Sequence, residues 1–153
     1  MVMPVGTPLV RSPRLDTRFV RYKLKIRQSR IHRFGVYALE HIPANRKVIE
    51  YTGERCNRRE AKKRGEGEHT YLFAVDTYWT LDGAVGGSGA EIINHSCEPN
   101  LVTRIMRGHI LYMSRRPIRR GEELTVDYNL EKDTGHNKCG CGTESCRGTL
   151  QKK

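Results

Sequence analysis

Three short segments toward the C-terminus combine residue types that could do chemistry. Asn94-His95-Ser96-Cys97 offers an amide, an imidazole and a thiol, groups that can grip a small polar ligand. Residues 122–128 end in Tyr128, whose hydroxyl can orient a reacting group. Cys139, Cys141 and Cys146 follow in a C-x-C-x4-C spacing among glycines. These segments predict a ligand site next to a metal site.

The cysteine spacing is typical of tetrahedral zinc, because thiolates this close together in a flexible loop can share one ion. Three thiolates leave one coordination position open. The residues alone do not decide between unligated thiols and a fourth ligand chosen from Cys97, Cys56, His136 and His95. Five cysteines are an odd number, which argues against a fully paired disulfide framework. We therefore expect a reducing, intracellular setting.

The chain of 153 residues is long enough for one domain with its own core and leaves no room for a second. Hydrophobic residues make up 37% and charged residues 29%. No apolar run approaches the roughly 20 residues that cross a bilayer. Residues 1–17 contain three prolines and lack the apolar stretch of a secretory signal. We expect these residues to form a flexible tail. We also expect that the protein does not associate with a membrane.

The net charge of +11 is unevenly distributed along the chain. Residues 1–64 have a balance of +12 and residues 101–153 one of +5, whereas residues 65–100 carry six acids and no Lys or Arg. A module that binds only nucleic acid does not need such an acidic window, but a protein that docks a basic peptide does. The basic flanks could contact DNA, or they could be an ordinary solvated surface.

Alternating apolar and charged residues predict strands over much of the chain. Apolar and basic residues alternate over 20–27, the period of a half-buried strand. Arg107-Gly108 is expected to be a tight turn between two further strands. The other strands are expected over 48–51, 70–75, 79–81, 101–106 and 109–113.

One short polar helix is expected to begin after the N-cap Asn57, with Glu60 three residues on, and to end at Gly65. Four glycines over 83–89 predict a loop, since a regular element would lose too much chain entropy there. The predicted fold class is mainly β (α+β).

Read in order, six segments resemble the SET-domain protein-lysine methyltransferases that carry a C-terminal post-SET zinc motif. They are residues 29–38, a glycine loop, and 48–54, 70–74, 94–100, 121–128 and 139–150. The resemblance implies a SET domain over 18–130, with several small β-sheets, few short helices and a C-terminal pseudoknot. A post-SET zinc segment would cover 131–153.

The resemblance implies transfer of a methyl group from S-adenosylmethionine to the ε-amine of a lysine in a histone or another basic protein. Tyr51, Tyr71 and Tyr128 match positions that line the lysine channel, and Tyr128 matches the catalytic tyrosine. An apolar channel lowers the lysine pKa and so favours the neutral amine that attacks. Each tyrosine alone would more simply be a strand-packing residue.

The resemblance also assigns Phe34, Gly35, Asn94 and His95 to S-adenosylmethionine. By themselves, Asn94 and His95 would be read as a turn with local side-chain bonds. One structural Zn²⁺ would be held by Cys97, Cys139, Cys141 and Cys146, and Cys56 would be a plain small side chain.

Three residues depart from the family pattern. Arg33 stands where the first loop glycine is usual, and a positive φ there would cost about 1 kcal/mol and could weaken cofactor binding. Glu91 stands where many members have arginine, with no role assigned. Val126 stands where many members have Phe or Tyr, and it leaves space. We expect methylation beyond one methyl group unless another aromatic side chain fills that space.

The competing hypothesis is a catalytically inactive SET-like module that binds chromatin or nucleic acid through its basic face. The presence of Tyr128 and Asn94 argues against it. A third hypothesis is a methyltransferase whose target is a basic protein other than a histone. The sequence does not separate the two targets, because the groove around residues 65–90 would set selectivity. The expected location is the nucleus in a eukaryote, and the cytoplasm or nucleoid in a bacterium.

Overall fold

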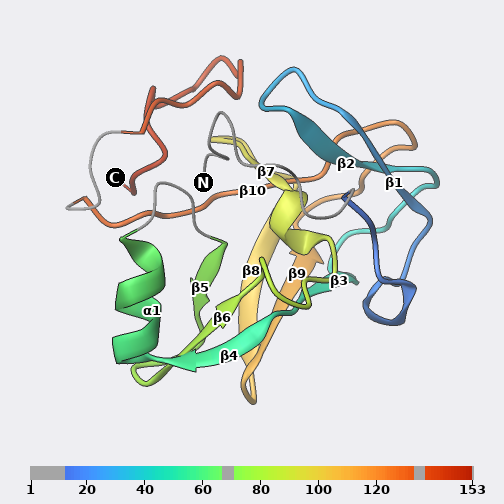
Figure 1. Cartoon of the computed structure of the whole chain (residues 1–153). Coiled ribbons are helices and arrows are strands. Elements are labelled where there is room, and N and C mark those ends of the chain that lie inside the picture. Colours follow the sequence, from blue (N-terminus) through green and yellow to red (C-terminus); the bar gives the residue numbers. More distant parts are fainter. Residues whose placement is uncertain (1–12, 67–70, 133–136, 153) are drawn as a thin grey trace.

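The computed structural model describes residues 13–66, 71–132 and 137–152. Within these ranges the chain forms four small sheets, one α-helix and two short 3-10 turns, Thr17–Phe19 and Ala90–Ile92 (Figure 1). Among these residues, no helix has the length and apolar character needed to span a membrane. The predicted mainly-β architecture with few short helices is confirmed.

Two of the sheets have three strands and are antiparallel. The first has the order β3 (Lys47–Tyr51), β9 (His109–Ser114), β8 (Leu101–Met106), and the second β4 (Glu54–Asn57), β6 (Trp79–Asp82), β5 (Leu72–Ala74). A third sheet pairs β1 (Leu24–Gln28) with β2 (Phe34–Ala38) as an antiparallel hairpin. The fourth pairs β7 (Asn94–His95) with β10 (Thr125–Val126) in parallel.

The parallel pairing of β7 and β10 sets two of the predicted site segments side by side. The two strands run together near the middle of the molecule, close to β2 (Figure 1). Asn100 fixes the pairing from outside, since its Nδ2 donates to the Glu123 carbonyl at 2.8 Å and its Oδ1 accepts from Thr125 N at 2.9 Å. This neighbourhood of segments is what the expected pseudoknot requires.

The core lies where the sheets meet. Along the central strand β9, Ile110, Tyr112 and Ser114 are buried and alternate with more exposed residues. The rings of Tyr51, Phe73 and Tyr112 contact one another with centroids 5.2 to 6.4 Å apart. Such aromatic contacts add about 0.5–1.5 kcal/mol each beyond burial, and here they join the two three-stranded sheets.

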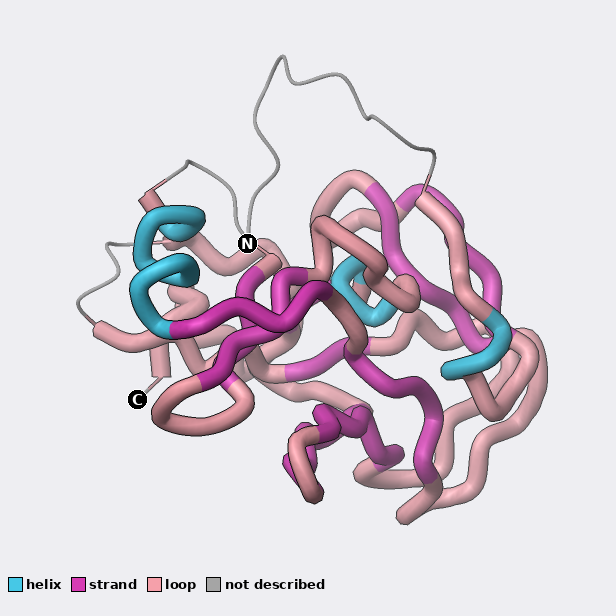
Figure 2. Tube along the Cα trace, turned by 60° about the horizontal axis from the view of Figure 1, so that its bottom comes forward, coloured by secondary structure: helices cyan, strands magenta, loops and turns pink. Residues whose placement is uncertain are grey.

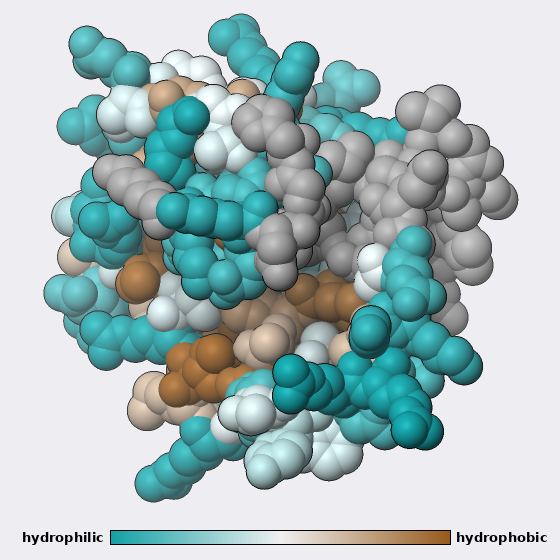
Figure 3. All heavy atoms as spheres, turned by 90° about the vertical axis from the view of Figure 1, so that its left-hand side faces the viewer, coloured by the Kyte–Doolittle hydropathy of each residue, from teal (hydrophilic) through white to brown (hydrophobic). Residues whose placement is uncertain are grey.

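The helix α1 (Arg58–Gly65) has no buried residue and lies beside the β4-β6-β5 sheet (Figure 1). Asn57 caps it by accepting a hydrogen bond from Glu60 N at 3.0 Å, as predicted. Arg64 fastens it to the sheet through ion pairs with Glu54 at 2.9 Å and Asp82 at 2.8 Å. The face on this side is mainly hydrophilic, with one apolar patch (Figure 3).

The strand predictions are confirmed where neighbouring residues alone determine the strand and the turn that follows it. The strands β3, β5, β6, β8 and β9 lie where they were expected, within one or two residues. Arg107 and Gly108 have φ values of +50° and +80°, as a tight hairpin turn requires. The expected loop over 83–89 is also present.

Two expectations differ in extent from the structure. The strand expected over 20–27 begins only at Leu24, and Val20 makes an isolated bridge to Ile49. Of the tail expected over 1–17, residues 1–12 lie outside the described residues; within 13–17, Leu15 packs against the core and Asp16 N donates to Ser88 O at 2.8 Å. Loops and turns make up much of the described chain between the strands (Figure 2). Part of the segment read as a glycine loop, residues 29–38, is strand β2.

Candidate functional site

Asn94 ties the β1-β2 hairpin to the centre of the molecule. Its Nδ2 donates to the carbonyl oxygens of His32 at 3.2 Å and Phe34 at 2.8 Å, and to Glu123 Oε1 at 2.8 Å. All three partners are acceptors, which fixes the orientation of the amide. The Asn94 side-chain oxygen makes no hydrogen bond within the described residues, although the residue is only 5% exposed. It remains open to a donor from a ligand.

Glu123 organises the same corner, and the sequence did not reveal it. Its carboxylate accepts from Ser29 Oγ at 2.8 Å, from Tyr37 Oη at 3.1 Å and from Asn94 Nδ2. Hydrogen bonds to a charged acceptor are the stronger ones. One carboxylate therefore joins the turn after β1, strand β2 and strand β7.

Gly35 is required here by space and not by its backbone angle. A Cβ at this position would lie 2.1 Å from Glu123 Oε1. Arg33, at the turn of the hairpin, has a φ of +35°, so the strained conformation anticipated for this departure is present. Phe34, between them, is 36% exposed and gives its carbonyl to Asn94.

His95 holds Tyr128 through its ring. Nδ1 accepts from Tyr128 N at 3.0 Å, and Nε2 lies 3.5 Å from Cys97 Sγ. Burial lowers the pKa of His95 to about 4, although nearby Asp127 favours the protonated ring. The neutral ring therefore carries its proton on Nε2 and directs it at the cysteine sulfur. The imidazole is engaged on both nitrogens by the protein, so it is not available to a ligand.

The Tyr128 hydroxyl is fixed at the end of the β7 segment. It donates to the carbonyl oxygen of Ile93 at 2.7 Å, and its ring lies 5.4 Å from the His95 ring. Burial, more than the neighbouring Tyr71 and Glu123, raises the pKa of Tyr128. The hydroxyl thus stays protonated at neutral pH and has one defined orientation.

Tyr51 and Tyr71 approach Tyr128 from two other elements. The Tyr51 hydroxyl donates to the Tyr71 carbonyl, and the Tyr51 ring is 1% exposed, whereas Tyr71 is half-buried. Burial raises the pKa of both, and Tyr51 also responds to Tyr112 and Tyr128. The structure therefore brings the three predicted tyrosines into one cluster, with Tyr112 as an unpredicted fourth member.

Glu91 packs on the glycine loop beside this cluster. Its Oε2 accepts from Gly89 N at 2.9 Å, and a Cβ at Gly87 would lie 2.6 Å from its carboxylate. Burial raises the pKa of Glu91. Glu91, which stands where many family members have arginine, thus places a half-buried carboxylate against the loop of residues 83–89. This contact explains why that loop needs small residues.

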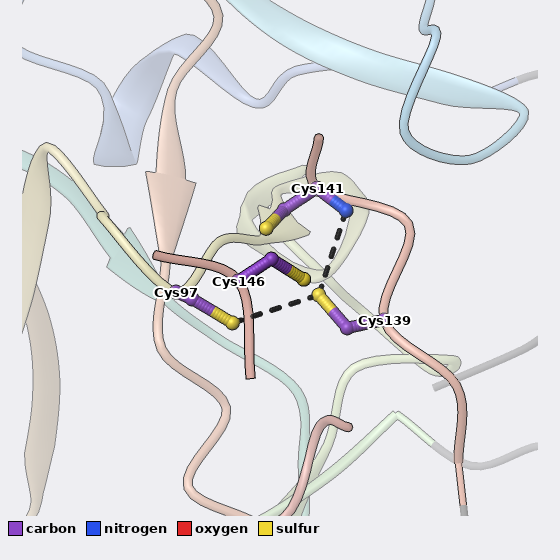
Figure 4. Close-up of side chains that lie close together, drawn as sticks. All are labelled: Cys97, Cys139, Cys141 and Cys146. Atoms are coloured by element: carbon purple, nitrogen blue, oxygen red, sulfur yellow. Dashed lines mark hydrogen bonds between the residues drawn. The ribbon is translucent and has the colours of Figure 1, made fainter. Parts of the chain in front are cut away.

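The four cysteines of the predicted metal site converge. The sulfurs of Cys97, Cys139, Cys141 and Cys146 all lie within 4.8 Å of one another, pointing inward from two distant parts of the chain (Figure 4). Cys97 Sγ and Cys139 Sγ are 3.7 Å apart. Tetrahedral zinc with Zn–S bonds of about 2.3 Å places its sulfurs about 3.8 Å apart, so this donor set fits such an ion.

The other two candidate ligands that the structure describes have different partners. The Cys56 thiol is buried in β4 against Thr80 O at 3.5 Å, and His95 contacts Cys97 instead of joining the cluster. His136 lies outside the described residues. The structure thus supplies Cys97 as the fourth sulfur.

Arg147 joins the cysteine-rich segment to the tyrosine site. Its guanidinium makes two hydrogen bonds to the Asp127 carboxylate, at 2.8 and 3.0 Å, and its backbone N donates to Cys97 Sγ at 3.3 Å. Although burial opposes it, this pairing lowers the pKa of Asp127. Asp127 directly precedes Tyr128. The Arg147–Asp127 contact therefore links the position of the C-terminal segment to the position of Tyr128.

The comparison with protein families identifies this arrangement. The family model described as the SET domain matches residues 33–129, well over half of the chain. The chain belongs to the SET domain family. The resemblance drawn from six short segments is thereby confirmed, and the cysteine cluster agrees with a post-SET motif behind the SET domain.

Several SET proteins are similar over most of this chain. It is 38% identical to the Schizosaccharomyces pombe protein named histone-lysine N-methyltransferase, H3 lysine-4 specific, over 97% of this chain and 17% of that protein. Identity to human histone-lysine N-methyltransferase SETD1A is 38%, over 87% of this chain and 8% of that protein. Identity to Caenorhabditis elegans histone-lysine N-methyltransferase set-2 is 34%, over 87% of this chain and 10% of that protein. The chain spans less than a fifth of the length of these relatives.

Five site residues escaped the sequence analysis, four of them because their partners are remote in the sequence. Ser29 and Glu123 are 94 positions apart, and Asp127 and Arg147 are 20 apart. Tyr112 sits in a correctly predicted strand, but nothing in its local sequence distinguishes it from a packing residue. The motif around Tyr128 contains Glu123 and Asp127 and offered the only signal for them.

Proposed function

We propose that this SET domain transfers a methyl group from S-adenosylmethionine to the ε-amine of a lysine in a histone or another basic protein. One observation carries the proposal: the Tyr128 hydroxyl is fixed on the carbonyl of Ile93, the residue before Asn94, beside the buried tyrosines Tyr51 and Tyr112. The names of the similar proteins, all histone-lysine N-methyltransferases, support the same activity.

The tyrosine cluster suits the chemistry of a lysine amine. A free lysine with a pKa of about 10.4 is neutral in only about one molecule in 2,500 at pH 7, and only the neutral amine has a lone pair. Aromatic side chains exclude water and so disfavour the ammonium form. The Tyr128 hydroxyl and the carbonyl oxygens around it would orient the amine, and orientation with fixed dipoles would carry most of the rate increase.

The corner around Asn94 fits S-adenosylmethionine. The open Asn94 oxygen can accept from an ammonium group, and Phe34 offers an exposed aromatic face beside it. Gly35 and the His95 backbone complete the predicted contacts. The bound co-substrate would supply a sulfonium whose methyl carbon is already electrophilic, so no acid–base pair is required.

We also propose that the four clustered cysteines hold one structural Zn²⁺. Four thiolates make a closed site with no position for substrate, as in structural zinc centres. Its effect would be to fasten residues 137–152 to the β7 segment through Cys97. Arg147 and Asp127 would carry that restraint to Tyr128.

The nature of the substrate rests on chemistry and on the relatives' names. If histones are the targets, the protein works on chromatin, and its basic flanks could touch DNA there. A non-histone basic protein remains the second candidate. An inactive SET-like module that binds chromatin or nucleic acid is the alternative from another class; a tyrosine hydroxyl held in a single orientation favours the enzyme.

The test is to incubate the protein with isotopically labelled S-adenosylmethionine and a mixed proteome, and to map labelled lysines by mass spectrometry. We expect labelling that falls about a hundredfold or more in Tyr128→Phe, because that variant loses only the orienting hydroxyl. Tyr78→Phe removes the same atom from a side chain that is 75% exposed, and serves as the matched control. Equal labelling by wild type and Tyr128→Phe would contradict the assigned role.

A further inference from the structure

Strand β8 forms a free edge of the β3-β9-β8 sheet. Among the described residues it pairs along its whole length with β9 and with no other strand (Figure 1). Ser114, which stands opposite Leu101, bonds residues 45–46 through both its N–H and its C=O. Hydrogen-bonded pairs alternate along an antiparallel ladder, so the peptide groups of Thr103 and Ile105 also point away from β9. Outside β9, no described residue hydrogen-bonds to the backbone of these two residues.

This edge also carries exposed apolar side chains. Val102 is 38% exposed, Ile105 46% and Met106 56%. Proteins usually protect an exposed edge with a proline, a bulge or several charges. Strand β8 contains no proline and one charged residue, and its register with β9 is continuous over all six positions. The edge is therefore open to the addition of another strand.

The charge along the edge is positive. Arg104, in the middle of β8, and Arg107, at the hairpin turn, are exposed and form no ion pair with a carboxylate of the described residues. Glu50 belongs to the same cross-strand row as Arg104, but it lies two strands away and pairs with His109 at 2.8 Å. In an added antiparallel strand, the residue opposite Arg104 would stand in a pair without backbone hydrogen bonds, where side chains come closest. An acidic side chain suits that position.

We propose that the β8 edge binds, by strand addition, an extended segment of a partner protein in which apolar and acidic side chains alternate. Its backbone pairs with the outward peptide groups of Thr103 and Ile105. Its acidic side chains lie on the face of Arg104, and its apolar side chains lie on the opposite face, beside Ile105. This surface is separate from the tyrosine site, and its arginines disfavour the basic protein that the methyl transfer requires.

A second copy of this chain is a poorer occupant. Two copies of β8 that use all four outward peptide groups would pair Thr103 of each copy with Ile105 of the other. That register sets Arg104 directly opposite Arg104 of the other copy, and like charges in this position are destabilising. The net charge of +11 adds repulsion between two whole chains.

The experiment uses a fluorescein-labelled peptide of about ten residues, the length of a long strand, that alternates valine and glutamate. A peptide that alternates valine and lysine is the control. We expect saturable binding of the valine–glutamate peptide only, measured by fluorescence anisotropy, and slower amide exchange at Thr103 and Ile105 in the complex. In Arg104→Glu, affinity for the valine–glutamate peptide should fall about tenfold or more, and affinity for the valine–lysine peptide should rise.

The backbone contribution is tested by Thr103→Pro. This variant removes an N–H that points away from β9, and proline is tolerated in an edge strand at such a position. It should abolish binding, whereas Thr103→Ala keeps the N–H and should bind like wild type. Tyr128→Phe should also bind like wild type, because the edge does not depend on methyl transfer.

Three results would overturn the proposal. They are no saturable binding by wild type, binding that persists in both Arg104→Glu and Thr103→Pro, and a dimer of wild type that dissociates in Thr103→Pro. The last result would make a second copy the occupant of the edge. If Thr103→Pro does not fold, the charge reversal at the exposed Arg104 decides by itself, since equal affinities of wild type and Arg104→Glu contradict the proposal.

Discussion

Glu123 shows how far the site depends on single side chains with remote partners. Its carboxylate receives hydrogen bonds from Ser29, Tyr37 and Asn94, which belong to three different segments. Asn94, in turn, holds the carbonyls of His32 and Phe34. Backbone hydrogen bonds also join β2 to residues 122–124, with Leu124 N donating to Val36 O at 2.7 Å. Side chains then tie the turn after β1 and strand β7 into the site proposed for S-adenosylmethionine.

We predict that Glu123→Gln loosens the β1-β2 hairpin. The glutamine amide replaces one accepting oxygen by an NH2 group, which cannot accept from Ser29, Tyr37 or Asn94. At least one hydrogen bond is therefore lost, at a cost of about 1–3 kcal/mol. Hydrogen exchange should quicken in residues 29–35, and S-adenosylmethionine should bind more weakly. Glu122→Gln is the matched control, because Glu122 pairs with Arg116 and Arg119. Equal exchange in the two variants would refute the assignment.

At this scale the sequence could reveal residues whose signal is local. Asn94, Tyr128 and the cysteines stand in short motifs; the structure gathers the four cysteines and fixes the Tyr128 hydroxyl on the carbonyl of the residue before Asn94. It could not reveal that the His95 ring is used internally to hold Tyr128 N, because that depends on the parallel pairing of β7 with β10. It also could not reveal which tyrosine hydroxyls have hydrogen-bond partners.

Among the elements, the glycine loop over 83–89 connects the tyrosine cluster to the β4-β6-β5 sheet. Gly83 N donates to the Tyr71 carbonyl at 2.9 Å, the same oxygen that accepts from the Tyr51 hydroxyl. The loop thus sets the position of Tyr71 relative to Tyr51. Its glycines reflect close packing as well as chain flexibility.

We predict that Gly83→Ala destabilises the protein by about 1–3 kcal/mol, since the new methyl group overpacks a filled site. The added Cβ would lie 2.7 Å from the Tyr51 hydroxyl oxygen and 3.0 Å from Glu91 Cβ. Gly65→Ala is the control, because its Cβ would be 3.6 Å from Leu72 Cδ1, and it should be neutral or stabilising by about 0.5–1 kcal/mol. Urea unfolding measures both. Equal stability of the two variants would argue against the tight contact.

A helix or strand could be predicted when the residues that determine it are close together in the sequence. The β8-β9 hairpin follows from alternation and a two-residue turn, and α1 follows from its N-cap. The two-residue strands β7 and β10 have no pattern of their own and exist only because they pair with each other. Strand β2 was hidden because residues 29–38 were interpreted through a glycine motif.

Seen as a whole, the molecule uses most of its acidic window internally. Asp82 pairs with Arg64, Asp76 accepts from Tyr78 N and Trp79 N, and Glu98 accepts from Ser145 N. Glu91 packs on the glycine loop. These carboxylates are therefore held in place by contacts within the protein, and the Asp82 charge is compensated by Arg64, so a basic peptide would meet fewer freely moving acidic side chains than the composition suggests.

The last prediction concerns how the C-terminal segment stays attached. With metal bound, we expect one zinc ion per chain by elemental analysis, because the four clustered thiolates form one closed site. A chelator should loosen residues 137–152. Among the described residues, their other contacts are mainly Arg147–Asp127, Glu98–Ser145 and the pairing of Leu130 and Glu131 with residues 150–152. Hydrogen exchange should rise there while β3 and β9 stay protected, and methyl transfer should fall. Cys97→Ser should mimic the chelator, whereas Cys56→Ser should keep the zinc. Unchanged protection of residues 137–152 after complete zinc removal would show that the segment docks without the metal.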